Sequence, residues 1–305
     1  MEGRVIAAHG RQYVVELADG SRLPCFPRGK KSDIACGDRV DIKQTSDDQG
    51  VIEAIQPRSS LLYRSNEIRQ KLIAANVDQL VIVVATEPAF SDELIARALV
   101  AAESEEIEPL IVLNKCDLAD KLPAARQRLA VLSGLGYRVL ELSALEHAED
   151  LRPHLANQTS VLVGQSGMGK STLVNALIPE ARAATREISL ALDSGKHTTT
   201  HATLYHLDAD SHLIDSPGLQ EFGLGHLDLQ EIEQAFPEFR PYLGQCRFRD
   251  CRHNREPDCA LIAAVDAEKI DKTRFATYHR IVSTQRMSLN KVREASPGEG
   301  MGFSP

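Results

Sequence analysis

The sequence lacks any long hydrophobic run. Its longest apolar stretch, Leu80 to Ala85, is far shorter than the roughly 20 residues that a membrane-spanning helix needs. The first ten residues also lack the hydrophobic segment of a secretory signal. These absences predict a cytoplasmic protein that has no membrane partner.

The composition shows none of the biases of non-globular chains. Apolar residues make up 43% and charged residues 26% of the 305 residues, close to the averages for soluble globular proteins. Wholesale disorder, collagen-like repeats and disulfide scaffolds are therefore excluded. The length is sufficient for two or three domains.

Charge is distributed unevenly within a net charge of -8. Residues 1–58 carry 9 basic and 9 acidic side chains, residues 59–239 carry 14 and 26, and residues 240–305 carry 12 and 8. A basic end on an acidic chain suggests contact with a polyanion, although many basic helices are only solvated surfaces.

Residues 1–58 alternate apolar and polar side chains in short runs punctuated by glycine, which is typical of hairpins in a small antiparallel sheet. We predict an all-β domain of about five strands. An oligonucleotide-binding (OB) fold barrel fits this length, with Arg28, Lys30 and Lys31 as candidate phosphate contacts. A β-domain that only packs against its neighbours fits the pattern equally well.

Residues 59–235 form the central region. From about residue 72 the sequence pattern changes to apolar runs typical of buried strands, separated by helical stretches, which predicts a doubly wound α/β domain. Strands are expected at 80–85, 109–113, 138–142 and 160–163, with helices near 91–105, 123–133 and 170–177. Residues 236–290 are expected to form a mainly α unit with a basic helix at 273–287. Residues 291–305, rich in Gly, Ser and Pro at their end, are expected to be a disordered tail.

The segment 164–171 reads Gly-Gln-Ser-Gly-Met-Gly-Lys-Ser and satisfies the P-loop pattern, with a predicted strand before it and a helix after it. Glycines let backbone N–H groups turn toward phosphates, Lys170 reaches the β and γ oxygens, and the Ser171 hydroxyl can ligate Mg²⁺. The predicted phosphate-binding residues are Gly164, Gln165, Ser166, Gly167, Met168, Gly169, Lys170, Ser171 and Thr172.

The segment Asn114-Lys115-Cys116-Asp117 follows a predicted strand, at the edge of the sheet where ligands bind. Guanine offers two adjacent donors that match one carboxylate, so Asp117 is expected to select guanine over adenine. Alone this four-residue match is weak, but it becomes strong beside a P-loop. Ser143 and Ala144, after the next strand, are candidates for backbone contacts to the guanine oxygen.

The segment Asp215-Ser-Pro-Gly218 also ends a predicted strand, and it offers Asp215 to the Mg²⁺ shell and the Gly218 N–H to the γ-phosphate. Upstream, Thr198 to Thr200 lie in a long polar loop, and Thr199 is our candidate metal ligand among them. A threonine run in a loop is usually inert, but this one lies between the P-loop and Asp215.

These five sequence boxes are those of a GTPase in an unusual order, because the base-reading boxes precede the phosphate-binding boxes. The same sheet closes if the usual chain ends are joined before Ser160 and new ends are cut after Asp215. The sequence therefore predicts a circular permutation, and the segment that senses γ-phosphate then leads directly into the C-terminal unit.

The C-terminal unit contains Cys246, Cys251, His253 and Cys259, whereas the other cysteines, Cys25, Cys36 and Cys116, are scattered. Three thiolates and one imidazole form a closed tetrahedral set for zinc, so the predicted site is structural. Metal-free reduced cysteines are the alternative.

Together the N-terminal barrel, the permuted boxes, the Gly-Lys-His-Thr-Thr-Thr segment at 195–200 and the Cys-Cys-His-Cys set resemble the ribosome small-subunit-dependent GTPase A family. The resemblance covers about residues 1–290. It implies a late assembly factor of the small ribosomal subunit, a GTPase stimulated by that subunit, and contacts of the barrel and zinc unit with ribosomal RNA. Lys196 stands where relatives often have arginine, and it keeps the charge.

We therefore expect a monomeric, Mg²⁺-dependent enzyme that converts GTP to GDP, with one structural Zn²⁺ and with Lys170, Asp215 and His197 as catalytic residues. His197 is the candidate for positioning water because Leu219, directly after the Asp-x-x-Gly box, has no donor or acceptor, and Gln220 is one residue late. A loop histidine that only packs or contacts RNA is its alternative. The alternative functions are an RNA-binding module that holds GTP without hydrolysis and, less favoured, a P-loop kinase.

Overall fold

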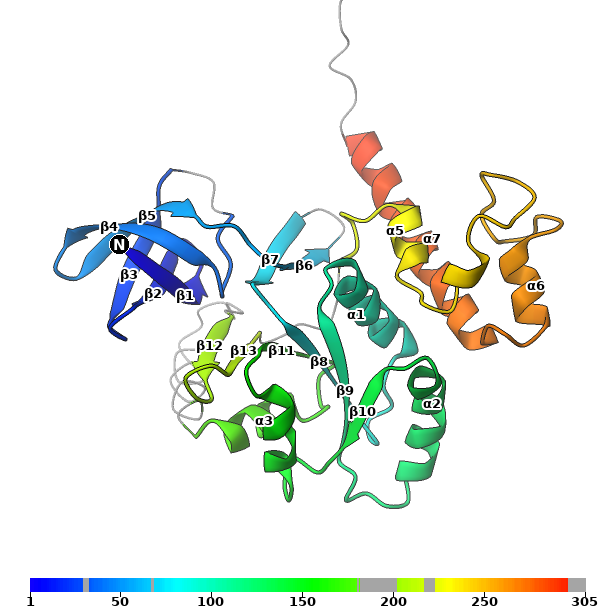
Figure 1. Cartoon of the computed structure of the whole chain (residues 1–305), viewed down its shortest axis with the longest axis horizontal. Helices are drawn as coiled ribbons and strands as arrows, with labels where there is room; N and C mark the ends of the chain where they lie inside the picture. The colour runs from blue at the N-terminus through cyan, green and yellow to red at the C-terminus, as the bar shows by residue number, and fades with distance from the viewer. Residues whose placement is uncertain (30–32, 67–68, 180, 182–201, 217–222, 296–305) are drawn as a thin grey trace, which may run out of the picture.

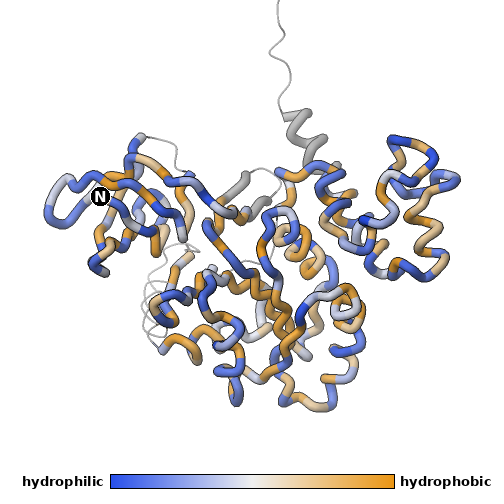
Figure 2. Tube along the Cα trace, in the orientation of Figure 1, coloured by the Kyte–Doolittle hydropathy of each residue, from blue (hydrophilic) through white to orange (hydrophobic). Residues whose placement is uncertain are grey.

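The computed structural model describes residues 1–29, 33–66, 69–179, 181, 202–216 and 223–295 (Figure 1). The hydrophobic residues in these ranges are concentrated in the strands of the central sheet, while the loops of the barrel and of the C-terminal unit are mostly hydrophilic (Figure 2). No helix in the described ranges is long and apolar enough to cross a membrane.

The N-terminal strands close into a five-stranded barrel, as predicted. They are β1 (Glu2–His9), β2 (Gln12–Leu17), β3 (Arg22–Pro27), β4 (Arg39–Ser46) and β5 (Gln49–Ile55). The strand order is β1-β2-β3-β5-β4, and β4 returns to pair with β1, so the barrel has no free edge between these strands. The side chains of Val5, Val15 and Val40 are completely buried inside it.

A two-stranded hairpin follows the barrel and was not expected from the sequence. It consists of β6 (Leu61–Asn66) and β7 (Arg69–Ala75), and a single bridge from Cys36 to Ala74 connects it to the barrel. The segment from the barrel to the central sheet is therefore structured rather than an open linker.

The central sheet has the strand order β10-β9-β8-β11-β13-β12, and all neighbours are parallel except β12 and β13. Its strands are β8 (Gln79–Ala85), β9 (Glu108–Asn114), β10 (Arg138–Glu141), β11 (Thr159–Val163), β12 (Thr203–His206) and β13 (His212–Asp215). Its helices are α1 (Asp92–Ser104), α2 (Leu122–Gly134), the 3₁₀ helix η1 (Ala148–Leu155) and α3 (Lys170–Leu177). The predicted α/β domain is thus confirmed.

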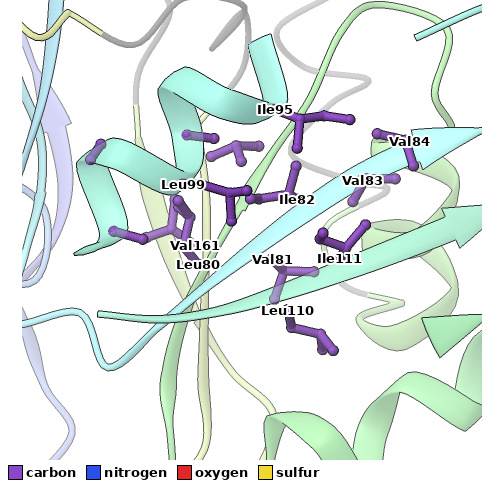
Figure 3. Close-up of a cluster of buried hydrophobic side chains, with 14 of the residues drawn as sticks. Leu80, Val81, Ile82, Val83, Val84, Ile95, Leu99, Leu110, Ile111 and Val161 are labelled. Carbon is purple, nitrogen blue, oxygen red and sulfur yellow. The ribbon is translucent and has the colours of Figure 1, made fainter. Parts of the chain in front are cut away.

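Strand β8 lies between two parallel strands and is buried along its whole length. Ile95 and Leu99 of α1 project onto Ile82 and its neighbours on β8, which explains the continuous apolar run at this position (Figure 3). This core fixes the carboxyl ends of β8, β9 and β11, from which the loops of the site emerge.

The C-terminal unit contains α5 (Leu229–Gln234), the 3₁₀ helix η2 (Arg240–Tyr242), α6 (Ala260–Asp266) and α7 (Lys272–Ala295). Phe236, Phe239 and Tyr278 are fully buried and their rings lie 4.9 to 5.6 Å apart. Helix α7 packs against α1 and extends five residues into the stretch where we expected a tail (Figure 1). Residues 296–305 lie outside the described ranges.

Candidate functional site

The P-loop connects β11 to α3 and depends on glycine at two positions. Gly164 and Gly169 have φ angles of 144° and 92°, which residues with a side chain rarely adopt. A Cβ atom on Gly164 would lie 2.2 Å from the Val83 carbonyl oxygen, and one on Gly169 would lie 2.1 Å from Asn114 Nδ2. Met168 is buried, whereas Ser166 and Gly167 are exposed, so the tip of the loop is accessible to a ligand.

Lys170 begins α3 and folds back over the loop. Its Nζ donates hydrogen bonds to the carbonyl oxygens of Gly164 at 2.5 Å and Gln165 at 2.8 Å. Ser171 and Thr172 are exposed in the first turn of the same helix. A phosphate chain at this helix N-terminus would offer Lys170 a charged partner instead of two carbonyl groups.

Asp215 ends β13 and is paired in parallel register with Leu162 of β11, which places it beside the strand that enters the P-loop. Burial raises the pKa of Asp215, and the positive charge of Lys170 opposes this shift. Burial also lowers the pKa of Lys170, and here the charge of Asp215 opposes it. Each group therefore favours the charged form of the other, which is the form that phosphate and metal binding require.

Asn114 ends β9, is only 1% exposed, and connects three parts of the site. Its Nδ2 donates to the Met168 carbonyl oxygen of the P-loop at 2.8 Å. Its Oδ1 accepts hydrogen bonds from the backbone N–H groups of Lys115 and Ala144, both at 2.8 Å. The Ala144 N–H that we expected to be offered to guanine is therefore already bonded to Asn114.

The other residues predicted to read the base follow Asn114 in the Lys115 turn or lie beside Ala144, the two backbone partners of its Oδ1. Asp117 is exposed, and Cys116 is half-buried with its Sγ donating to the Leu113 carbonyl oxygen at 3.1 Å. Ser143 is 3% exposed, and its Oγ has no hydrogen-bond partner among the described residues. A buried hydroxyl without a partner is costly, so its position beside the turn predicted to read the base fits a polar ligand there.

Several predicted residues lie outside the described ranges. They are Lys30 and Lys31 of the barrel, Lys196, His197 and Thr198 to Thr200 of the polar loop, and Gly218, Leu219 and Gln220 after Asp215.

The second cluster brings together the four predicted zinc ligands, Cys246, Cys251, His253 and Cys259, whose ligand atoms all lie within 4.8 Å of one another. Cys246 Sγ lies 3.8 Å from Cys259 Sγ, and His253 Nδ1 lies 3.5 and 3.3 Å from these two sulfurs. Zn–S bonds of about 2.3 Å and Zn–N bonds of about 2.0 Å in a tetrahedron require separations of about 3.8 and 3.5 Å. The residues present therefore fit Zn²⁺, and Nδ1 is the nitrogen positioned to bind it.

Sequence reasoning missed the carboxylate behind this cluster. Glu233 Oε1 of α5 lies 3.5 Å from His253 Nε2 and accepts a hydrogen bond from the Tyr278 hydroxyl at 2.8 Å. A carboxylate at the second ring nitrogen of a metal-binding histidine orients the ring. Twenty residues separate Glu233 from His253, so no local motif could have revealed the contact.

The family model described as RsgA GTPase matches residues 55–225. A protein named small ribosomal subunit biogenesis GTPase RsgA from Burkholderia pseudomallei (strain K96243) is 58% identical over 286 residues, covering 92% of this chain and 91% of the relative. The protein of the same name from Bordetella pertussis (strain Tohama I) is 58% identical over 285 residues, with 92% and 95% covered.

Two solved structures align with most of the chain. The crystal structure of YjeQ from Thermotoga maritima aligns with a TM-score of 0.71 at 32% identity, covering 93% of this chain and 98% of that one. The structure of YloQ, described as a circularly permuted GTPase, aligns with a TM-score of 0.68 at 28% identity, covering 93% and 94%. The permuted fold predicted from the order of the sequence boxes is confirmed.

Proposed function

This chain belongs to the RsgA GTPase family and is a GTP-hydrolysing enzyme, and we propose that binding to the small ribosomal subunit stimulates its hydrolysis of GTP to GDP. Its curated relatives are named for small ribosomal subunit biogenesis, so it acts in the maturation of that subunit. We further propose a late step of assembly, a cytoplasmic monomer, and a division into a barrel (1–58), a GTPase domain (59–235) and a zinc unit (236–290).

The observation that most directly supports nucleotide binding is the set of three hydrogen bonds made by the Asn114 side chain. They hold the phosphate loop, the Lys115 turn and the Ala144 turn as one rigid unit. A mononucleotide whose base and phosphates occupy the two ends of this unit would bind to a preorganised surface. In this proposal Asn114 and Asp117 read guanine, and residues 164–172 hold the phosphates.

Mg²⁺ would neutralise the negative charge that develops on the β- and γ-phosphate oxygens during hydrolysis, and its protein ligands would be Ser171, Thr199 and Asp215. Lys170 would bind the β and γ oxygens. His197 would position the attacking water when the chain is bound to the subunit; this role is proposed from the sequence alone.

Exposed side chains of the C-terminal unit support the proposal that this unit contacts ribosomal RNA. Four arginines in the zinc-binding loop are exposed: Arg247, Arg249, Arg252 and Arg255. Phe248 among them is 42% exposed, and the Arg247 guanidinium lies 5.5 Å from its ring centre. Positive charge beside an exposed aromatic ring suits phosphate contacts together with base stacking.

Single-turnover hydrolysis of GTP with and without purified small subunits tests the proposal. We expect the subunits to accelerate hydrolysis and His197→Ala to abolish most of the acceleration while GTP affinity is retained, with Gln220→Ala as the matched control. If GTP binds but is not hydrolysed under either condition, the chain is an RNA-binding module that uses GTP as a structural ligand.

Asp117→Asn tests guanine reading separately. Replacing the carboxylate with an amide removes the match to the two guanine donors but creates one to the C2 carbonyl of xanthine. We expect GTP affinity to fall by at least about tenfold and xanthosine triphosphate to become the better ligand. An unchanged preference for GTP in a competition titration would show that Asp117 does not select the base.

A further inference from the structure

The connection between β8 and α1, residues 86–91, contains none of the GTPase sequence boxes, yet it contacts both loops of the nucleotide site. Its first residue, Thr86, is half-buried and follows the fully buried end of β8. Its last residue, Ser91, is the N-cap of α1. The contacts along this connection suggest a role in the site rather than simple chain connection.

Thr86 and Glu87 hold the turn that reads the base. The Thr86 Oγ1 hydroxyl donates to the Lys115 carbonyl oxygen at 3.0 Å, and the Thr86 N–H donates to the Asn114 carbonyl oxygen at 3.2 Å. In the opposite direction, Lys115 Nζ donates to the Glu87 carbonyl oxygen at 2.8 Å. The turn is thus bonded to this connection at three points.

The Lys115 turn needs such support because of its backbone conformation. Lys115 has a φ angle of 63°, in the left-handed region that residues with a Cβ rarely occupy. This strained peptide directs the chain toward Asp117, two residues later. Within the described residues, the Lys115 carbonyl oxygen accepts one backbone donor, the Leu118 N–H at 3.0 Å, and one side-chain donor, the Thr86 hydroxyl.

The same connection reaches the phosphate loop. The Ser91 N–H donates to Gln165 Oε1 at 2.8 Å. A Cβ atom on Gly167 would lie 3.4 Å from Pro88 Cγ, so the two segments are in close proximity. Residues 86–91 therefore set the position of the base-reading turn relative to the P-loop.

We propose that Thr86 is a positioning residue for nucleotide specificity, which acts through Asp117 by fixing the Lys115 peptide. The inference rests on the proposed reading of guanine by Asp117. Loss of the Thr86 hydroxyl lets the Lys115 peptide relax and moves the Asp117 carboxylate away from the two guanine donors. The phosphate contacts keep their own support from Gln165 and Asn114.

Thr86→Val keeps the branched shape and removes only the hydroxyl. The affinities of the full-length chain for GDP and inosine diphosphate (IDP), whose base lacks the exocyclic amine, are measured by displacement of a fluorescent nucleotide. Displacing Asp117 costs GDP two hydrogen bonds and IDP one, so we expect the preference for GDP over IDP to fall by about tenfold. Thr86→Ser, which retains the donor, is expected to keep the preference of the wild type.

Thr45→Val is the matched control, because it removes a bond from a threonine hydroxyl to the Gln49 carbonyl oxygen in the barrel. An unchanged GDP preference in Thr86→Val, or an equal loss in Thr86→Ser, would overturn the proposal. If GDP and IDP lose affinity equally, Thr86 is a structural residue only. A wild-type chain without any GDP preference would instead refute guanine reading itself, and this inference with it.

Discussion

Asn114 illustrates how one side chain can determine the geometry of a whole site. Both ends of its amide are bonded, and it is buried, so displacement would leave donors and acceptors of three loops without partners. Each buried group left unsatisfied costs about 1–3 kcal/mol. A Cβ atom on Gly169 would displace it, because that atom would overlap with the Asn114 amide nitrogen.

Gly169→Ala should therefore disrupt the site through Asn114. The new methyl group would lie 2.1 Å from Asn114 Nδ2, and the φ angle of 92° disfavours alanine. We expect GDP affinity, measured by isothermal titration calorimetry, to fall by at least about tenfold.

Gly136→Ala is the matched control for this change. Gly136 has a φ angle of 95°, but a Cβ atom there would meet no atom of the described residues within 4 Å. It should lose about 1–2 kcal/mol of stability from backbone strain and keep its GDP affinity. If both variants lose the same affinity, backbone strain rather than displacement of Asn114 is the cause.

At the scale of elements, the C-terminal unit has two sources of stability, the Cys-Cys-His-Cys cluster and the aromatic cluster, and Glu233 contacts both of them through His253 and Tyr278. A zinc ion held by the Cys-Cys-His-Cys cluster would join the loop before α6 to the start of that helix, because Cys259 is its N-cap residue. Helix α7 instead packs through Tyr278 on Phe236 and Phe239, and Arg280 lies 3.8 Å from Glu93 of α1. Metal loss should therefore affect these two parts unequally.

Removal of zinc with a chelator tests whether the metal stabilises the loop before α6 and the helix α6 more than it stabilises α7. The chain purified without added metal should contain about one zinc per molecule, and stripping it should lower amide-exchange protection in residues 246–266 by at least about tenfold. Protection of residues 273–285 should change less. Equal protection with and without metal would contradict a structural zinc site, and collapse of both segments would show that the aromatic cluster cannot hold α7 alone.

The elements that the sequence predicted are those with strong local signals. The apolar runs of β8, β9 and β11 and the glycines of the P-loop each carry their information within a few residues. The hairpin β6–β7 was missed because it lies where one pattern changes to another. Thr86 and Glu233 were missed because their partners are 29 and 20 residues away, and no periodicity reports such contacts.

At the scale of the whole molecule, the barrel and the GTPase domain share one continuous sheet. Ala7 of β1 pairs with Thr203 of β12, and Arg4 Nη2 donates to Thr159 Oγ1 at the start of β11 at 2.9 Å. Strand β12 leads through β13 to Asp215. A movement of the barrel would therefore act on the strand pair that ends at the nucleotide site.

A chain of polar side chains also crosses this junction. Glu16 Oε1 of the barrel lies 2.9 Å from His206 Nε2, and His206 Nδ1 lies 2.9 Å from His212 Nδ1. A hydrogen bond between two ring nitrogens requires one of them to accept, so protonation of the accepting nitrogen breaks it. Burial, with the charges of Arg4 and His206, lowers the pKa of His212 to about 4, against the opposing charges of Asp208 and Glu16.

This shift predicts how the stability of the junction depends on pH. The folded pKa of His212 lies below the ordinary value of 6.5, so on acidification the unfolded chain takes up a proton first. The stabilisation is fully present above pH 6.5 and is lost as pH falls toward 4. After allowance for partial exposure, the loss between pH 7 and pH 5 should be about 1 kcal/mol, which lowers the unfolding midpoint by about 1–2 °C.

His212→Gln should remove this contribution, because glutamine does not titrate and can still accept a hydrogen bond from His206. We expect the thermal unfolding midpoint of the variant to fall less between pH 7 and pH 5 than that of the wild type. Carboxylates elsewhere in the chain are common to both proteins, so their effects cancel in the comparison. An identical pH dependence in the two proteins would mean that the contact between His206 and His212 does not limit the stability of the junction between the barrel and the GTPase domain.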